Sequence, residues 1–126
     1  MITLLLADDD PFVRQGLNTL LERVGDIRII GEASNGSDAI ALAQALHPDV
    51  VLMDISMPAP DGIAATAALR ASVPQCAVVL LSLYDDPSMR ARAHAAGAAI
   101  LVGKQEGVEI LLASIREAGE KGHEST

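Results

Sequence analysis

The chain has 126 residues and a formal net charge of -8, with nine Lys and Arg against seventeen Asp and Glu. This length fits one domain and leaves no room for a second, and the acidic balance excludes nucleic acid and anionic membrane as direct partners of the domain. Half of the residues are hydrophobic but only 2% are aromatic, so a core of Ala, Leu, Val and Ile is expected, which suits helices packed on a sheet.

The first apolar run, residues 2–7, predicts a strand. It meets acids at residue 8 and carries no basic residue, unlike a signal peptide or a membrane span. Asp10 then caps a helix over residues 11–24, whose apolar residues recur at helical spacing. Residues 27–33 mix charged and apolar side chains, as an edge strand does, and residues 37–46 predict a second helix.

The middle of the chain is organised around Asp54. Residues 50–53 form a short continuous apolar run, which predicts a strand buried on both faces with Asp54 at its carboxyl end. Prolines and a glycine follow and exclude regular structure before a third helix over residues 61–72. Burying an ionised carboxylate at the end of such a strand costs free energy unless it has a partner. We therefore expect a cation or hydrogen-bond donors from elsewhere in the chain near Asp54.

Two further strand and helix pairs complete the pattern. In order they are a strand over residues 77–81, a helix from about 87 to 96 with Gly97 as its C-cap, a strand over 98–102, and a helix over about 108–118. Ile110 is expected on the inner face of the last helix. The predicted domain spans residues 1–118, and residues 119–126 form a polar tail or the start of a linker.

Alternation of five strands with five helices predicts an α/β fold. We expect a three-layer α/β/α sandwich around a five-stranded parallel sheet of flavodoxin-like order 2-1-3-4-5. The single cysteine, Cys76, opens an apolar stretch and cannot build a disulfide framework. A small buried side chain and a cytoplasmic setting are therefore expected.

Polar residues stand at the carboxyl ends of four predicted strands: Asp8 and Asp9, Asp54, Ser82 and Lys104. In the predicted strand order these ends are neighbours, so three carboxylates and one ammonium would face one crevice. Carboxylate oxygens suit a small divalent cation such as Mg²⁺. Phosphoryl transfer needs mainly alignment and charge neutralisation, so this set would let Asp54 act as an in-line nucleophile.

The motifs in chain order are Asp8-Asp9, VVLMDISMPAPDG around Asp54, VVLLS ending at Ser82 and ILVGK ending at Lys104. This set resembles the receiver domain of bacterial two-component response regulators over nearly the whole chain. The segments LLLADDDPFVRQGLNTLLE and IRIIGEASNG are similar to those of the NarL/FixJ type. The resemblance implies a CheY-like fold.

The resemblance also implies roles for the residues of the site. Asp54 would accept a phosphoryl group from a sensor histidine kinase or a small phosphodonor, as a phosphoacceptor rather than a turnover enzyme. Asp9, Asp54 and the backbone carbonyl of Ser56 would bind Mg²⁺ directly, with Asp8 acting through water. Ser82 and Leu101 would form the switch.

Partners follow from the same resemblance. Phosphorylation would draw Ser82 and Lys104 inward and bias the face made by the fourth helix, fifth strand and last helix, for dimerisation or release of an output domain. Members of the NarL/FixJ type continue into a DNA-binding helix-turn-helix domain. DNA is therefore expected as a partner only through a further domain, and membrane is not expected.

Three positions depart from the family pattern. Leu101 stands where the family carries Tyr or Phe, Gln105 where Pro follows the lysine, and Leu83 where a small residue is common. A cis bond without proline costs about 3 kcal/mol, so the bond after Lys104 is expected to be trans or held by its surroundings. These departures leave a phosphorylation-independent pseudo-receiver as an alternative. A Mg²⁺-dependent phosphohydrolase is another, although it would need an acid where Ser56 stands.

The remaining polar residues have simpler interpretations. Three acids are interpreted as helix starts: Asp10, Asp61 and Asp86. The histidines lack metal-like spacing and are taken as structural or exposed: His47, His94 and His123. Tyr84 is a candidate for tuning the access of water to an acyl phosphate.

Overall fold

The computed structural model describes residues 1–83 and 86–124, with the side chains of residues 121–124 left out. The described elements are, in chain order, β1 (Ile2–Ala7), α1 (Pro11–Glu22), β2 (Ile27–Ala33), α2 (Gly36–Leu46), β3 (Val50–Asp54), α3 (Gly62–Ser72), β4 (Ala77–Ser82), α4 (Pro87–Ala96), β5 (Ile100–Gly103), a 3₁₀ helix η1 (Lys104–Glu106) and α5 (Val108–Glu124). Every predicted strand and helix is present.

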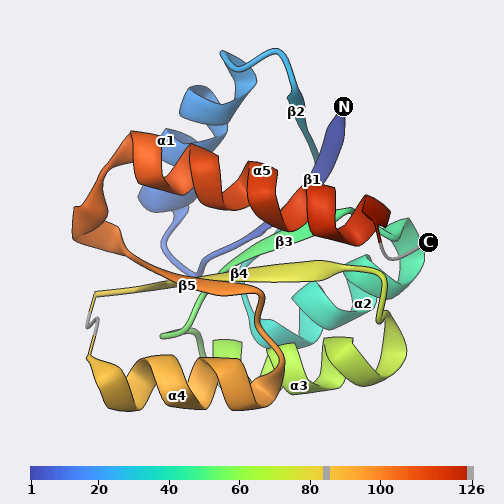
Figure 1. The fold of residues 1–126 in the computed structure, drawn as a ribbon, viewed down its shortest axis with the longest axis vertical. Helices are drawn as coiled ribbons and strands as arrows, with labels where there is room; N and C mark the ends of the chain where they lie inside the picture. The colour runs from blue at the N-terminus through green and yellow to red at the C-terminus, as the bar shows by residue number, and fades with distance from the viewer. Residues whose placement is uncertain (84–85, 125–126) are drawn as a thin grey trace.

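All five strands are parallel and lie in the order β2-β1-β3-β4-β5, as predicted. Helices α1 and α5 cover one face of the sheet, and α2, α3 and α4 cover the other (Figure 1). The fold is therefore the three-layer α/β/α sandwich expected from the sequence, with β2 at one edge and β5 at the other.

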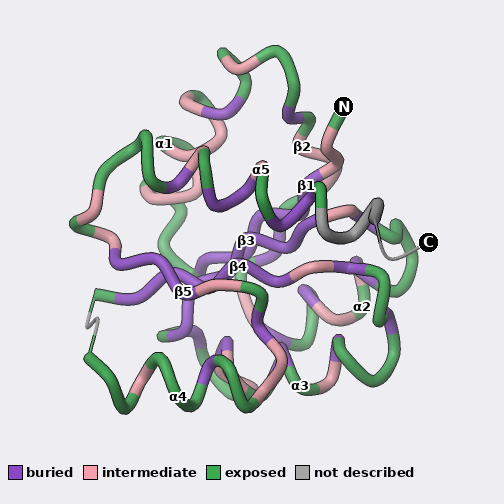
Figure 2. Tube along the Cα trace, viewed as in Figure 1, coloured by how far each residue is buried: buried purple, intermediate pink, exposed green. Residues whose placement is uncertain are grey.

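Two apolar layers hold the helices to the sheet. Leu6 and Leu52 point toward α1 and α5 and pack with Ile115. On the opposite face, Leu5 and Val51 belong to a cluster with apolar residues of α2, α3 and α4. The central strand β3 is buried along its whole length, and the buried segments concentrate in the sheet in Figure 2. This confirms the prediction that its continuous apolar run is covered on both faces.

Helix starts follow the predicted caps. The carboxylates of Asp10, Asp61 and Asp86 accept hydrogen bonds from backbone N–H groups in the first turns of α1, α3 and α4. Gly97 ends α4 with a φ of 99°, a left-handed conformation that glycine adopts without strain.

Cys76 is 1% exposed, and this burial raises the pKa of its thiol to about 12. Its predicted role as a buried filler is confirmed.

Helix α5 departs most from expectation. It continues to Glu124 rather than ending near residue 118. Gly119 does not end the helix, because it is buried against Ile2, and a Cβ there would lie 2.9 Å from the Ile2 Cδ1 atom. Ile110, predicted to face inward, is 48% exposed. The small size of Gly119 thus allows α5 to pack closely against β1.

Smaller differences lie at other element ends. Helix α1 ends at Glu22, two residues early, and Phe12 in its first turn is 81% exposed. Strand β5 begins at Ile100 because Ala98 belongs to the turn after α4, where its N–H donates to the Ala93 carbonyl.

None of the helices in the described part of the chain has the length and apolar character needed to cross a membrane.

Candidate functional site

The site lies where four neighbouring strands end. Asp8 and Asp9 follow β1, Asp54 is the last residue of β3, Ser82 is the last of β4, and Lys104 follows β5 directly. These ends lie at one edge of the sheet because β1, β3, β4 and β5 are adjacent and parallel. The structure therefore brings together the residues that the sequence placed at one crevice.

Three carboxylates form a compact acidic cluster, defined as Asp8, Asp9 and Asp54. One oxygen from each lies within 4.8 Å of the others. Asp8 and Asp54 are 1% and 4% exposed, whereas Asp9 is exposed to solvent. Two carboxylates this deeply buried require compensation by a cation or by donors.

Lys104 provides part of that compensation. Its Nζ lies 3.4 Å from Asp54 Oδ1 and 3.8 Å from Asp8 Oδ2. The bond from Lys104 to Gln105 is trans, since the cis bond in the described chain is Ala59–Pro60. Gln105 is exposed and lies in η1, so the missing proline does not carry the lysine away from the acids.

Backbone donors hold the acids from the other side. Asp8 Oδ1 accepts from the N–H of Asp10 at 2.9 Å, and Asp54 Oδ1 accepts from the N–H of Ser56 at 3.3 Å. The remaining oxygen of Asp8, Oδ2, is buried without a hydrogen-bond partner among the described residues. An unsatisfied, buried carboxylate oxygen next to two further carboxylates is a donor set that fits a small divalent cation.

Burial raises the pKa of Asp8 above its ordinary value, and the neighbouring charge of Asp54 adds to this effect. The Asp10 N–H and the Lys104 ammonium oppose it without cancelling it. The folded chain thus keeps the Asp8 proton to a higher pH than the unfolded chain does. Its stability accordingly falls as the pH rises through the folded pKa.

Without divalent cations, Asp8→Asn is expected to raise the free energy of unfolding near pH 7 by about 1–2 kcal/mol. The reason is that the change removes a buried charge whose Oδ2 has no hydrogen-bond partner. Urea denaturation followed by circular dichroism measures the difference. The advantage of the variant should shrink as the pH falls through the raised pKa of Asp8, because the wild-type carboxyl then becomes neutral as well. A variant no more stable than the wild type near pH 7 would contradict the expectation.

The switch residues are placed as follows. Ser82 is 3% exposed and lies in register with Gly103 of β5. Leu101 is 5% exposed and lies opposite Leu80 in the sheet, so its side chain is part of the core. Leu83, directly after Ser82, is 62% exposed. Tyr84, proposed to tune water access, lies outside the described residues.

Neither histidine whose side chain the structure describes contributes to the acidic cluster. His47 forms the left-handed C-cap of α2, and His94 is exposed on α4. The side chain of His123 is outside the described part. The group able to hold a metal among the described residues is the acidic cluster itself.

One contact at the site was not predicted from the sequence. Arg14 of α1 donates from Nη1 to the backbone carbonyl of Asp8 at 2.6 Å. Its position four residues after the Asp10 cap places it one turn into the helix, where it can reach back to the β1 end. The sequence offered this spacing as a signal, but nothing in it distinguished Arg14 from a solvated helix residue.

A doubly wound parallel sheet that gathers buried carboxylates and a lysine at its carboxyl edge defines a class of domain, the aspartate phosphoacceptor of signalling proteins. Residues 4–116 match the family described as the response regulator receiver domain. The chain belongs to this family, and its function is that of a phosphoacceptor domain in two-component signalling.

Known proteins similar to the chain support this membership. Response regulator GacA of Pseudomonas aeruginosa is 37% identical over 117 residues, covering 93% of this chain and 55% of GacA. The signal receiver domain of NarL from Mycobacterium tuberculosis is 32% identical, with a TM-score of 0.83 over 91% of this chain and 96% of that one. A LuxR-family response regulator from Aurantimonas sp. SI85-9A1 gives 28% identity and a TM-score of 0.92 over 96% and 86%.

These relatives place the domain in the NarL/FixJ subfamily. The chain spans about half the length of the curated relatives it matches, 55% in the case of GacA. The similarity therefore describes the receiver part of those proteins.

Proposed function

We propose that Asp54 is the phosphoacceptor of this receiver domain and takes its phosphoryl group from a sensor histidine kinase or a small phosphodonor. The observation that carries the proposal is the pairing of Asp54, almost fully buried at the end of β3, with Lys104 at 3.4 Å and two further acids. Buried charges clustered at a strand end are costly without a partner, so this arrangement supports a site that binds a charged ligand.

Mg²⁺ is the cation that we assign to the acidic cluster. Asp9, Asp54 and the backbone carbonyl of Ser56 would hold it directly, and Asp8 through water. The fit rests on hard oxygen donors within 4.8 Å of one another and on the unsatisfied Oδ2 of Asp8. A bound Mg²⁺ would neutralise charge on the phosphoryl oxygens during transfer.

The chain's own groups then carry the chemistry. An oxygen of Asp54 forms a bond to phosphorus while the bond from phosphorus to the donor breaks, and the electron pair leaves with the donor. The Lys104 ammonium balances charge on the phosphoryl oxygens, and the Ser82 hydroxyl offers a further hydrogen bond. The product is an acyl phosphate, which the domain also hydrolyses.

For the output we propose a switch at the α4, β5 and α5 face. Arg90 of α4 donates to the Leu101 carbonyl at 3.4 Å and its Nη2 lies 3.4 Å from Glu106 Oε1, so movement of η1 with Lys104 reaches α4. Leu101 has no aromatic ring to rotate inward, and the Arg90 contacts supply a route that does not depend on one. The face would form a homodimer or release a DNA-binding domain.

The sequence predicted that the receiver domain ends after residue 118. Because α5 continues to Glu124 with Gly119 packed against Ile2, we propose that a linker to such an output domain begins after α5. The length of the curated relatives leaves room for one. A cytoplasmic setting accords with the family and with the reduced, buried Cys76.

Incubation with acetyl phosphate and Mg²⁺ tests the phosphoacceptor. Intact-mass spectrometry should show one phosphoryl adduct on the wild type and none on Asp54→Asn, because the amide cannot act as the nucleophile. Asp10→Asn is the matched control. It removes one charge from the same acidic edge, retains the helix cap and should leave the adduct in place.

The other outcomes each favour a different function. A folded wild type that forms no adduct would indicate a pseudo-receiver, which Leu101 and Gln105 make the alternative to consider. Continuous release of phosphate without an accumulating adduct would indicate a phosphohydrolase, despite the serine at position 56. An adduct that survives Asp54→Asn would reject Asp54 as the acceptor.

A further inference from the structure

Arg14 makes a contact with the site that the proposed chemistry does not use. Its Nη1 donates to the backbone carbonyl of Asp8 at 2.6 Å, and its side chain is only 21% exposed. The N–H of the same residue, Asp8, donates to the carbonyl of Ala33 on β2 at 3.1 Å. The peptide groups on both sides of Asp8 are therefore held, one by α1 and the other by the edge strand.

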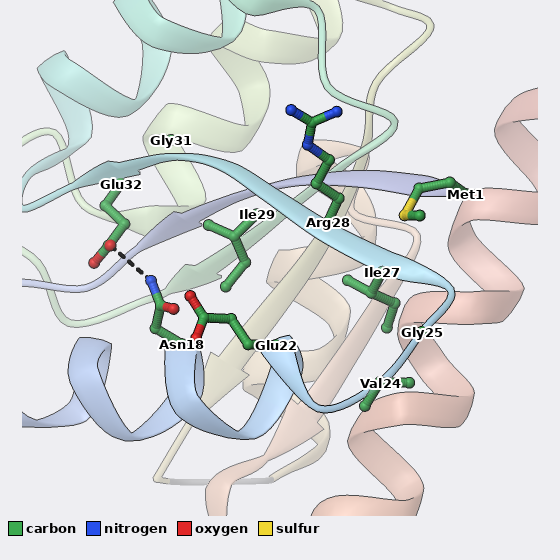
Figure 3. A pocket seen from close by; sticks show the side chains of 10 residues that line it. All are labelled: Met1, Asn18, Glu22, Val24, Gly25, Ile27, Arg28, Ile29, Gly31 and Glu32. Atoms are coloured by element: carbon green, nitrogen blue, oxygen red, sulfur yellow. Dashed lines mark hydrogen bonds between the residues drawn. The ribbon is translucent and has the colours of Figure 1, made fainter.

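Glu32 in turn fixes the guanidinium. Its Oε1 lies 3.6 Å from Arg14 Nε, and its Oε2 accepts from Asn18 Nδ2 at 2.8 Å. Figure 3 shows Glu32 of β2 reaching toward Asn18 of α1. The guanidinium is thus contacted at two of its nitrogens, by a hydrogen bond at Nη1 and an ion pair at Nε, and the two contacts together restrict the direction of its donor to Asp8.

This arrangement leads from β2 to the cation site. Asn18 donates a hydrogen bond to Glu32, and Glu32 forms an ion pair with Arg14. Arg14 in turn donates to the backbone carbonyl of Asp8. The side chains of Asp8 and Asp9 emerge from this same turn. Their directions relative to Asp54 thus depend on a residue that contacts none of the carboxylates in the cluster.

We propose that Arg14, fixed by Glu32, is a positioning residue for the divalent-cation site of the acidic cluster. The proposal rests on the proposed function, since it requires that the cluster binds Mg²⁺. Partners that orient metal ligands commonly change metal affinity by about 10–100-fold when they are removed.

The sign of the effect separates this role from simple electrostatics. Arg14 is a positive charge beside a cation site, and its removal alone would tighten the binding of Mg²⁺. Loss of the backbone contact would instead disorder the turn after β1 and weaken binding. Arg14→Ala therefore gives opposite results under the two explanations.

Isothermal titration calorimetry of the chain with MgCl₂ provides the test. We expect Arg14→Ala to bind Mg²⁺ about tenfold more weakly than the wild type. Arg14→Lys keeps the charge but loses the forked contact, so it should lie between the two. Arg28→Ala is the control for lost charge: this exposed residue points to the other side of β2, away from Asn18, and should leave the affinity nearly unchanged (Figure 3).

Glu32→Gln extends the test to the second member of the pair. If Glu32 acts through Arg14, the substitution should weaken binding several-fold in the wild type and have little effect in the Arg14→Ala background. Equal effects in both backgrounds would show that Glu32 acts as a charge only and would remove it from the proposal.

The results distinguish the inference from the proposed function. Mg²⁺ binding by Arg14→Ala that equals or exceeds wild-type binding overturns the role of Arg14 and leaves the cation site intact. No binding by the wild type rejects the cation site, and the role of Arg14 with it. If Arg14→Ala does not fold, as judged by circular dichroism, Arg14→Lys decides, and wild-type affinity in that variant overturns the proposal.

Discussion

Lys104→Met is expected to slow phosphorylation by acetyl phosphate about 100-fold, on the scale of losing one preorganised donor to a developing charge. The same variant should bind Mg²⁺ more tightly than the wild type. Both effects come from one geometry, because Lys104 Nζ lies 3.4 Å from Asp54 Oδ1 and 3.8 Å from Asp8 Oδ2. The ammonium competes with the cation for the acids and assists the phosphoryl group once it arrives.

The two readouts are adduct formation by intact-mass spectrometry over time and Mg²⁺ affinity by calorimetry. Methionine keeps the length of the side chain and removes the charge, which limits any change in packing. Arg23→Met is the matched control. It removes one positive charge from an exposed residue at the end of α1, so neither quantity should change. Unaltered phosphorylation in Lys104→Met would show that the ion pair is structural only.

The same substitution at two glycines should have opposite effects on stability. Gly62→Ala is expected to lower the free energy of unfolding by about 1–3 kcal/mol. A Cβ at Gly62 would lie 2.6 Å from the Asp54 carbonyl oxygen and 2.7 Å from the Ile55 Cα, and backbone cannot move aside as a flexible side chain can. Gly16→Ala should instead raise it by about 0.5–1 kcal/mol, because Gly16 lies inside α1 with open space around it.

Chemical denaturation followed by circular dichroism measures both variants. Gly62 also matters for the site, since its N–H donates to the Ile55 carbonyl and its closeness to Asp54 sets the start of α3 under the β3 end. Gly62→Ala should therefore weaken Mg²⁺ binding as well, whereas Gly16→Ala should not. If both variants changed the free energy of unfolding equally and with the same sign, helix propensity would determine the effect, and not the contact of a Cβ at Gly62 with the backbone of Asp54 and Ile55.

Much of the architecture followed from local patterns in the sequence. The run over residues 50–53 predicted a buried strand because it offers apolar side chains to both faces. Asp10, Asp61 and Asp86 predicted helix starts because their carboxylates can accept from free N–H groups. The alternation of strands and helices predicted a parallel sheet, and its order was taken from the flavodoxin-like arrangement of such sheets. In that order the strand ends that carry Asp8, Asp54 and Lys104 meet at one edge of the sheet.

The tertiary structure decided what depends on contacts between distant residues. The continuation of α5 past residue 118 depends on the contact between Gly119 and Ile2, which lie at opposite ends of the chain. Helical spacing alone could not assign Ile110 to solvent. The hydrogen bond from Arg14 to the Asp8 carbonyl and the ion pair between Glu32 and Arg14 link α1, the end of β1 and β2. Sequence determines such links only through the fold, because a side chain's partner depends on which elements the packing of the core brings side by side.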